Sequence, residues 1–75
     1  MESNFFLWGW QREQNLSNVK LADKIGVSES YISLVKRGER PLTPEVMMAV
    51  ARAIPELGVE CQAWLAQWFA GKVNE

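Results

Sequence analysis

Cationic and hydroxyl side chains gather in one stretch near the middle of the chain. Lys36, Arg37 and Arg40 fall within five residues of one another, and Ser30 and Ser33 precede them. Lys and Arg bind phosphate groups through their charge and donated hydrogen bonds, and a serine hydroxyl both donates and accepts. These residue types and spacings indicate binding to a ligand that carries phosphates and polar edges.

The residues needed for catalysis or metal binding are missing. With Cys61 as its single cysteine and no histidine, the chain can form neither an internal disulfide nor a zinc site of the usual Cys/His type. It also contains no glycine-rich phosphate loop and no plausible carboxylate pair. We therefore expect a protein that is not an enzyme and has no metal and no cofactor, with Cys61 as a reduced core residue.

Charge is distributed unevenly along the chain. The formal net charge of -1 disfavours contact with nucleic acid, because neutralising phosphates dominates that affinity. However, residues 12–40 contain six Lys/Arg against four Asp/Glu, a local charge of +2, and the rest contains two against five, or -3. The basic part therefore permits contact with a polyanion.

The totals favour a small globular protein. A length of 75 residues, 48% of them hydrophobic, predicts one domain over residues 1–75 with its own core. The N-terminus lacks a basic start and a small-residue cleavage pattern, which argues against a secretory signal. No apolar run approaches the roughly 20 residues that span a bilayer. We expect a cytoplasmic protein that does not contact membranes.

The hydrophobic pattern predicts an all-α fold of five helices with short connections and no strand. Capping side chains indicate helix starts at Ser17, Ser28 and Thr43, with Pro44 at a first helical position. Asn15 suits the left-handed conformation that ends many helices. The expected helices are residues 4–14, 17–25, 28–35, 44–54 and a last one that contains residues 61–69 and stops at Gly71.

Apolar residues at helical spacing are the predicted core. The first four helices contribute Phe6, Leu7, Trp10, Val19, Leu21, Ala22, Ile25, Tyr31, Ile32, Val35, Val46, Met47, Val50 and Ile54. The last helix contributes an uninterrupted apolar stripe of Cys61, Trp64, Leu65, Trp68 and Phe69.

The segments 18–25 and 28–35 are joined by a turn that contains Gly26, and two short helices with such a turn form a helix-turn-helix. Residues 18–38, NVKLADKIGVSESYISLVKRG, resemble the Xre/Cro family of phage-repressor-like DNA-binding domains. The matches cover the helix crossing, the turn, the cap and the inward face of the second helix, at Ala22, Gly26, Val27, Ser28, Ile32 and Val35. The resemblance implies a five-helix lambda-repressor-like domain with its helix-turn-helix at about residues 17–36.

The resemblance also implies that the helix over 28–35 enters the major groove of double-stranded DNA. Once its apolar residues face inward, four side chains are left for base edges, and they match the base-contacting positions of the family: Glu29, Ser30, Ser33 and Leu34. The two serines can bond to several bases, Glu29 can accept from cytosine N4, and Leu34 can pack on a thymine methyl group.

Phosphate contacts are expected at both ends of the motif, where they fix the register on DNA. Asn18 matches a position at which the family often places a phosphate-contacting Gln. Lys36, Arg37 and Arg40 follow the recognition helix and supply positive charge. The family usually has an acid at the position of Lys36, paired with an Arg of the first helix. We expect no such pair here and assign the charge of Lys36 to DNA instead.

Aromatic residues toward the C-terminus indicate self-association. Trp64, Trp68 and Phe69 offer more apolar surface than one small domain covers, and Trp is enriched at the centres of interfaces. Members of the family commonly bind DNA as twofold dimers. We therefore expect a nucleoid-associated homodimer that represses transcription from a specific operator, its own promoter being one candidate.

Two alternatives stay open. Residues 42–67 also resemble antitoxins of the host-inhibition-of-growth type, with a Pro44–Glu45 helix start and a Trp64–Leu65 pair followed by Gln67. That resemblance implies a toxin as a further partner. The net acidity and the four Trp are also compatible with a helix-turn-helix fold that serves only as a protein-interaction module, without DNA binding.

Overall fold

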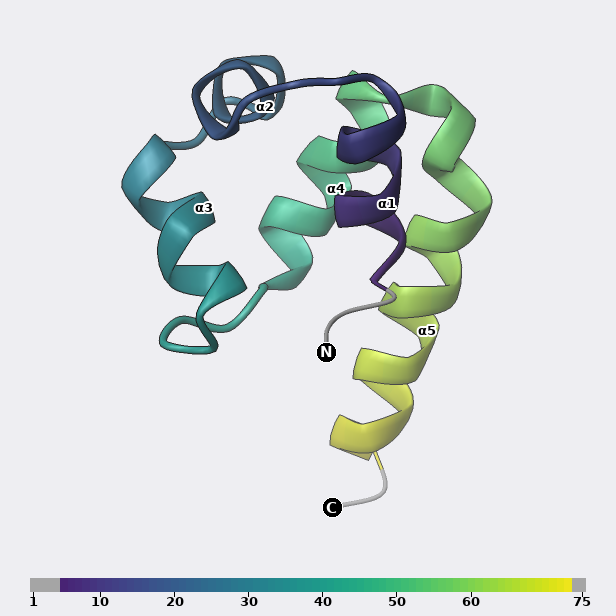
Figure 1. The fold of residues 1–75 in the computed structure, drawn as a ribbon. Helices are drawn as coiled ribbons and strands as arrows, with labels where there is room; N and C mark the ends of the chain where they lie inside the picture. The colour runs from purple at the N-terminus through teal and green to yellow at the C-terminus, as the bar shows by residue number, and fades with distance from the viewer. Residues whose placement is uncertain (1–4, 74–75) are drawn as a thin grey trace. The chain divides into compact units, whose positions relative to one another are not determined.

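The chain folds into helices. The computed structural model describes residues 5–73, and no strand occurs in that range. The elements are α1 (Phe6–Glu13), α2 (Asn18–Ile25), α3 (Glu29–Lys36), α4 (Pro44–Ala53), the 3-10 helix η1 (Pro55–Leu57) and α5 (Gly58–Val73) (Figure 1). The predicted all-α fold with five α-helices is confirmed. Asn4, the expected start of the first helix, lies outside the described residues.

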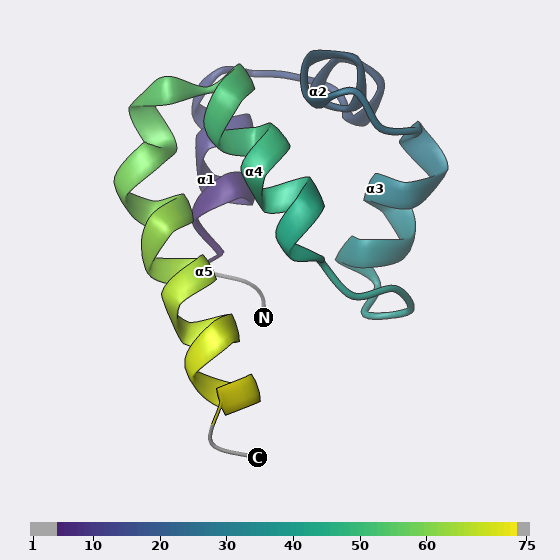
Figure 2. The same ribbon diagram turned by 180° about the vertical axis from the view of Figure 1, so that it is seen from behind.

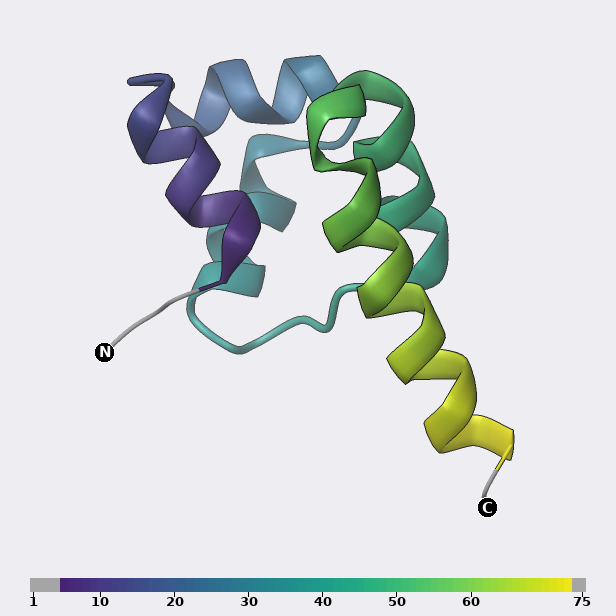
Figure 3. The same ribbon diagram turned by 90° about the vertical axis from the view of Figure 1, so that its right-hand side faces the viewer.

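Contacts between residues divide the chain into two units, residues 1–41 with α1 to α3 and residues 42–75 with α4, η1 and α5. In the first unit, α2 lies across one end and α3 leads away from it after a tight turn (Figure 1, Figure 3). In the second unit, α4 turns through η1 into α5, the longest of the described helices (Figure 2).

Side-chain caps set the starts of three helices, as the sequence predicts. The hydroxyl oxygens of Ser17, Ser28 and Thr43 accept hydrogen bonds from backbone N–H groups three residues on, at distances of 3.1, 3.1 and 3.3 Å. Each bond satisfies an N–H group that the first helical turn leaves without a partner. The starts of α2, α3 and α4 are therefore fixed by local chemistry.

Left-handed backbone follows α1 and α2. Asn15 and Gly26 have φ angles of 58° and 95°, in agreement with the expected helix ends. The N–H of Gly26 donates to the carbonyl oxygen of Ala22 at 2.7 Å and closes α2. The expected stop of the last helix at Gly71 is wrong, because Gly71 keeps a helical conformation and α5 continues to Val73.

The first unit has a core of buried apolar side chains, namely Leu7, Leu21, Ala22, Ile25 and Ile32. The expected burial of Val19 is wrong: its side chain is 50% exposed, because it lies on the side of α2 opposite Leu21. Four further residues of the predicted core are only partly buried, namely Phe6, Trp10, Tyr31 and Val35. A unit of three short helices has too little interior to enclose them all.

The second unit buries Met47, Val50, Ile54, Leu57 and Cys61. Beyond Cys61, the prediction of a buried α5 stripe is wrong, since Trp64 and Trp68 are partly exposed and Phe69 is 53% exposed. The rings of Trp64 and Trp68 stack with centroids 5.5 Å apart. We call these three residues the α5 aromatic surface.

Among the described residues, no helix is long and apolar enough to cross a membrane.

Candidate nucleic-acid interface

The outward face of α3 carries the predicted base-contacting side chains. Its start follows the Gly26 turn and the Ser28 cap directly, and Ile32 points into the core. The remaining side chains stay accessible, with Glu29 and Ser30 exposed and Ser33 and Leu34 partly exposed. Polar groups on one accessible helix face are what reading of base edges in a major groove requires.

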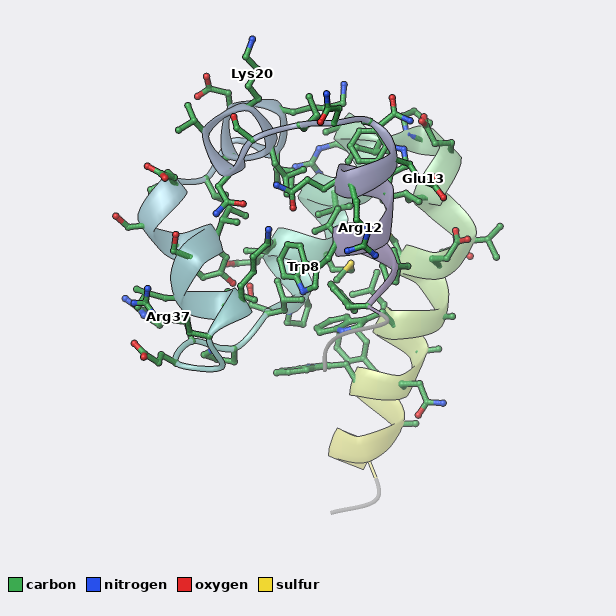
Figure 4. All side chains as sticks on the ribbon, in the orientation of Figure 1. Trp8, Arg12, Glu13, Lys20 and Arg37 are labelled. Atoms are coloured by element: carbon green, nitrogen blue, oxygen red, sulfur yellow. The ribbon has the colours of Figure 1, made fainter. Side chains whose placement is uncertain are left out.

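A short loop after α3 carries two of the predicted phosphate contacts. Arg37 lies at the end of α3 and points away from the helices (Figure 4). Its Nε is 3.3 Å from Oε2 of Glu39, and both side chains are more than half exposed, at 59% and 58%. An exposed ion pair of this kind contributes about 1 kcal/mol at most. Arg37 can therefore exchange Glu39 for a phosphate at little cost.

Tyr31 anchors this loop. Its hydroxyl donates a hydrogen bond of 2.8 Å to the backbone carbonyl oxygen of Pro41. Burial raises the pKa of Tyr31, and the nearby Arg40 lowers it by a smaller amount. The hydroxyl is therefore protonated, and able to donate, throughout the physiological pH range.

Three polar side chains from three helices form a network in the first unit. Nζ of Lys36 donates to Oε1 of Gln11 at 2.7 Å and to Oδ1 of Asn18 at 2.8 Å. Nε2 of Gln11 donates to the same Asn18 oxygen at 2.9 Å and to the carbonyl oxygen of Leu16 at 3.0 Å. The side chain of Gln11 is only 5% exposed. The network thus joins α1, α2 and α3 through hydrogen bonds that meet at the buried side chain of Gln11.

The Lys36 ammonium also lies over an aromatic ring. The centre of the Trp8 ring is 4.9 Å from Nζ, within the range of a cation–π interaction. Trp8 and Arg12 both project from α1 (Figure 4). Burial lowers the pKa of Lys36, and the positive charge of Arg12 lowers it further.

An open cleft of about 300 Å³ lies beside the network. Its lining consists of Trp8, Gln11, Arg12, Asn15, Leu16 and Lys36. Two of these side chains are cationic and none is acidic, so the cleft has a positive potential. Such a potential favours anions at this edge of the unit.

Comparison with known families decides what kind of domain these elements form. A helix-turn-helix family model, HTH_3, matches residues 10–57, which is more than half of the chain. The chain belongs to the Xre/Cro-type helix-turn-helix family. This DNA-binding family has no catalytic activity. No curated protein and no solved structure gave a significant match.

The Xre/Cro-type match confirms the resemblance carried by residues 18–38. Gln11 and Trp8, which contact Lys36 in this Xre/Cro-type protein, were not predicted from the sequence. A signal was present, because the resemblance implies an acid at position 36, and a Lys there needs a different partner on the first helix. The identity of that partner depends on how α1 packs, which the sequence pattern does not specify.

Proposed function

We propose that this Xre/Cro-type protein is a sequence-specific transcriptional regulator. It acts at the nucleoid as a repressor, binding an operator as a homodimer with residues 1–75 working as one helix-turn-helix domain. The observation that carries the proposal is α3, which begins at a capped serine after a glycine turn and keeps a polar face accessible. Family membership supports DNA as the ligand.

The α3 face supplies the proposed base contacts, through Glu29, Ser30, Ser33 and Leu34. Ser30 and Ser33 lie three residues apart on one side of the helix, so both reach the same groove. Neither serine makes the bidentate pair with one base that gives strong discrimination. Sequence preference is therefore expected to come from the four contacts together.

Phosphate binding is proposed for residues at the start of α2 and around the end of α3, with Asn18, Arg37 and Arg40 in direct contact and Lys36 supporting the contact of Asn18. The exposure of Arg37 and of Arg40 supports direct contact with the phosphates of the DNA backbone. Each cation that neutralises a phosphate increases the salt dependence of binding.

The α5 aromatic surface is the proposed dimer contact. Three aromatic side chains remain exposed or partly exposed on one helix, and Phe69 is the most exposed of them at 53%. Partly exposed aromatic residues favour association, because burying them removes a large apolar area from water. A twofold dimer would present two α3 helices to two half-sites.

The function can be tested by fluorescence anisotropy. The probes are the duplex from upstream of the protein's own gene and a scrambled duplex, each at low and at physiological salt. We expect tight binding to the upstream duplex alone, weakening steeply as salt rises. A reporter gene behind the same duplex is expected to lose expression when the protein is produced. Equal weak binding to both duplexes, or a rise in expression, would overturn the proposal.

The α5 aromatic surface also favours a second candidate, in which a different protein covers it. In the antitoxin version that protein is a toxin, and in the simpler version the helix-turn-helix fold serves protein contacts alone. A complex whose formation is unchanged by upstream duplex, from a chain that binds neither duplex, would favour the simpler version. A toxin that is released when operator DNA is added would favour the antitoxin.

A further inference from the structure

We propose that Lys36 and Gln11 are positioning residues for Asn18, fixing its side-chain amide so that Nδ2 donates to a DNA phosphate. The inference rests on the proposed DNA-binding function and gives Lys36 an indirect role in it. Asn18 is the first residue of α2. The N-terminus of a helix favours a negative charge there, so a phosphate is the expected acceptor.

The orientation of the Asn18 amide follows from which groups can donate. An ammonium group has no acceptor, so the Asn18 atom 2.8 Å from Lys36 Nζ has to be the oxygen, Oδ1. Gln11 Nε2 donates to the same oxygen from 2.9 Å. Both lone pairs of Oδ1 are then engaged by the protein. The nitrogen, Nδ2, is left on the other side of the amide, without an acceptor among the described residues.

Gln11 cannot reverse its own amide. Its oxygen accepts from Lys36, and its nitrogen donates both to Asn18 and to the backbone carbonyl of Leu16. Turning the amide over would place the nitrogen against the ammonium and the oxygen against two other oxygens. With 5% of Gln11 exposed, water has little room to compensate for such a change.

Lys36 is an exposed residue, but its ammonium contacts the protein. Two hydrogen bonds and the ring of Trp8 hold it in place. Two of its three N–H groups donate within the network, so moving the ammonium away to a distant phosphate would break both bonds and leave the buried oxygen of Gln11 without a donor. That loss is costly for a buried polar atom, so an indirect contribution is favoured.

An acid at position 36 would impose the opposite orientation. A carboxylate accepts hydrogen bonds, so it would attract Nδ2 of Asn18 and turn Oδ1 outward. Oδ1 of Asn18 and a phosphate oxygen of the DNA would then face each other, and neither can donate a hydrogen bond. The donor character of Lys36 is therefore matched to the use of Asn18 as a donor.

A double-mutant cycle on DNA affinity tests the arrangement, with the upstream duplex as the probe. Asn18→Ala and Lys36→Met are each expected to weaken binding about tenfold, as expected for one hydrogen bond to a charged group. Because both changes remove the same contact, the double variant is expected to bind no more weakly than the weaker single variant. Losses that multiply in the double variant would overturn the proposal.

Salt dependence separates positioning from direct contact. Lys36→Gln removes the charge but keeps an amide that can donate to Gln11 and Asn18, so most of the affinity is expected to remain. The matched control is Lys24→Gln, because Lys24 is an exposed lysine of α2 outside the network. Equal salt slopes for the two variants support positioning. The salt slope is the change in the logarithm of the binding constant with the logarithm of salt concentration. If this slope is smaller by about 0.9 in Lys36→Gln than in Lys24→Gln, Lys36 contacts a phosphate directly and the positioning role is overturned.

A measurement without DNA distinguishes this arrangement from the function on which it rests. Scalar couplings across the χ1 bond of Asn18 are expected to show one rotamer in the free wild-type protein and averaging in Lys36→Met. Averaging in the wild type would overturn the positioning role. If Asn18 has one fixed rotamer but the wild-type protein binds neither duplex, the positioning by Lys36 stands. The proposed DNA-binding function and the phosphate contact of Asn18 are then overturned.

Discussion

The hydroxyl of Tyr31 on α3 is bonded to the backbone carbonyl oxygen of Pro41, at 2.8 Å. This bond ties the end of the loop to the helix from which the loop departs. Arg37 and Arg40 lie between the two bonded residues. The bond therefore fixes the loop that carries Arg37 and Arg40, two candidate phosphate contacts, relative to α3, the candidate base-contacting helix.

Tyr31→Phe removes this bond while keeping the ring. We expect the free energy of unfolding, measured by urea denaturation, to fall by about 0.5–1 kcal/mol. DNA affinity is expected to fall for all duplexes alike, because the loop contacts phosphates and not bases. A changed preference between two duplexes, with unchanged stability, would contradict this view of Tyr31.

The same bond predicts a dependence on pH. Burial makes the pKa of Tyr31 higher in the folded protein than its ordinary value of 10.0. The stabilisation is therefore complete below the unfolded pKa and is lost as pH rises through the folded pKa. Denaturation midpoints of the wild type and Tyr31→Phe are expected to differ near neutral pH and to converge above the folded pKa. A constant difference over this range would speak against the bond.

Gly26 and Gly9 provide a matched pair of substitutions. Gly26→Ala places a side chain at a φ of 95° and is expected to lower the free energy of unfolding by about 1–2 kcal/mol. Gly9 lies inside α1, and nothing is within 4 Å of an added Cβ. Gly9→Ala is therefore expected to raise stability by about 0.5–1 kcal/mol. Urea denaturation measures both, and effects of the same sign would refute the assignment of the turn.

Trp68→Ala is expected to weaken self-association more than Ser33→Ala does. Trp68 belongs to the α5 aromatic surface, whereas Ser33 lies on α3. Loss of a large interface aromatic commonly costs about 2 kcal/mol or more in association free energy. Sedimentation equilibrium gives the dimer constants, and equal constants for the two variants would exclude this surface as the dimer contact.

Arg37→Glu and Ser33→Ala are expected to affect DNA binding in different ways. Charge reversal at Arg37 is expected to weaken binding to all duplexes and to reduce the salt slope by about one. Ser33→Ala is expected to change the ranking among related duplexes with little change in the slope. Anisotropy titrations against a small set of operator variants measure both effects. A sequence-dependent loss in Arg37→Glu would place that residue at a base edge.

Features that depend on neighbouring residues could be predicted from the sequence. The caps at Ser17, Ser28 and Thr43 and the left-handed positions at Asn15 and Gly26 are as expected, since each involves groups a few residues apart. The family follows from the same local pattern, because the spacing of the turn and of the inward residues defines it.

Features that depend on packing could not be predicted. Val19 and Phe69 occupy helical positions compatible with burial, yet each side chain is at least half exposed. Gln11 and Lys36 lie 25 residues apart, and no periodicity relates them. Their contact requires α1 and α3 to meet at one place, which is a property of the folded unit. The sequence therefore predicted the exposed residues of the candidate site, but it did not predict the residues that support them, such as Gln11.

Cys61 gives the second unit a reporter of its own motion. The thiol is fully buried, and burial together with Glu60 raises its pKa, so little reactive thiolate is present near neutral pH. An alkylating reagent can reach the sulfur only when the helices around it separate. The rate of alkylation therefore measures how often this unit opens, and no probe has to be engineered into the chain.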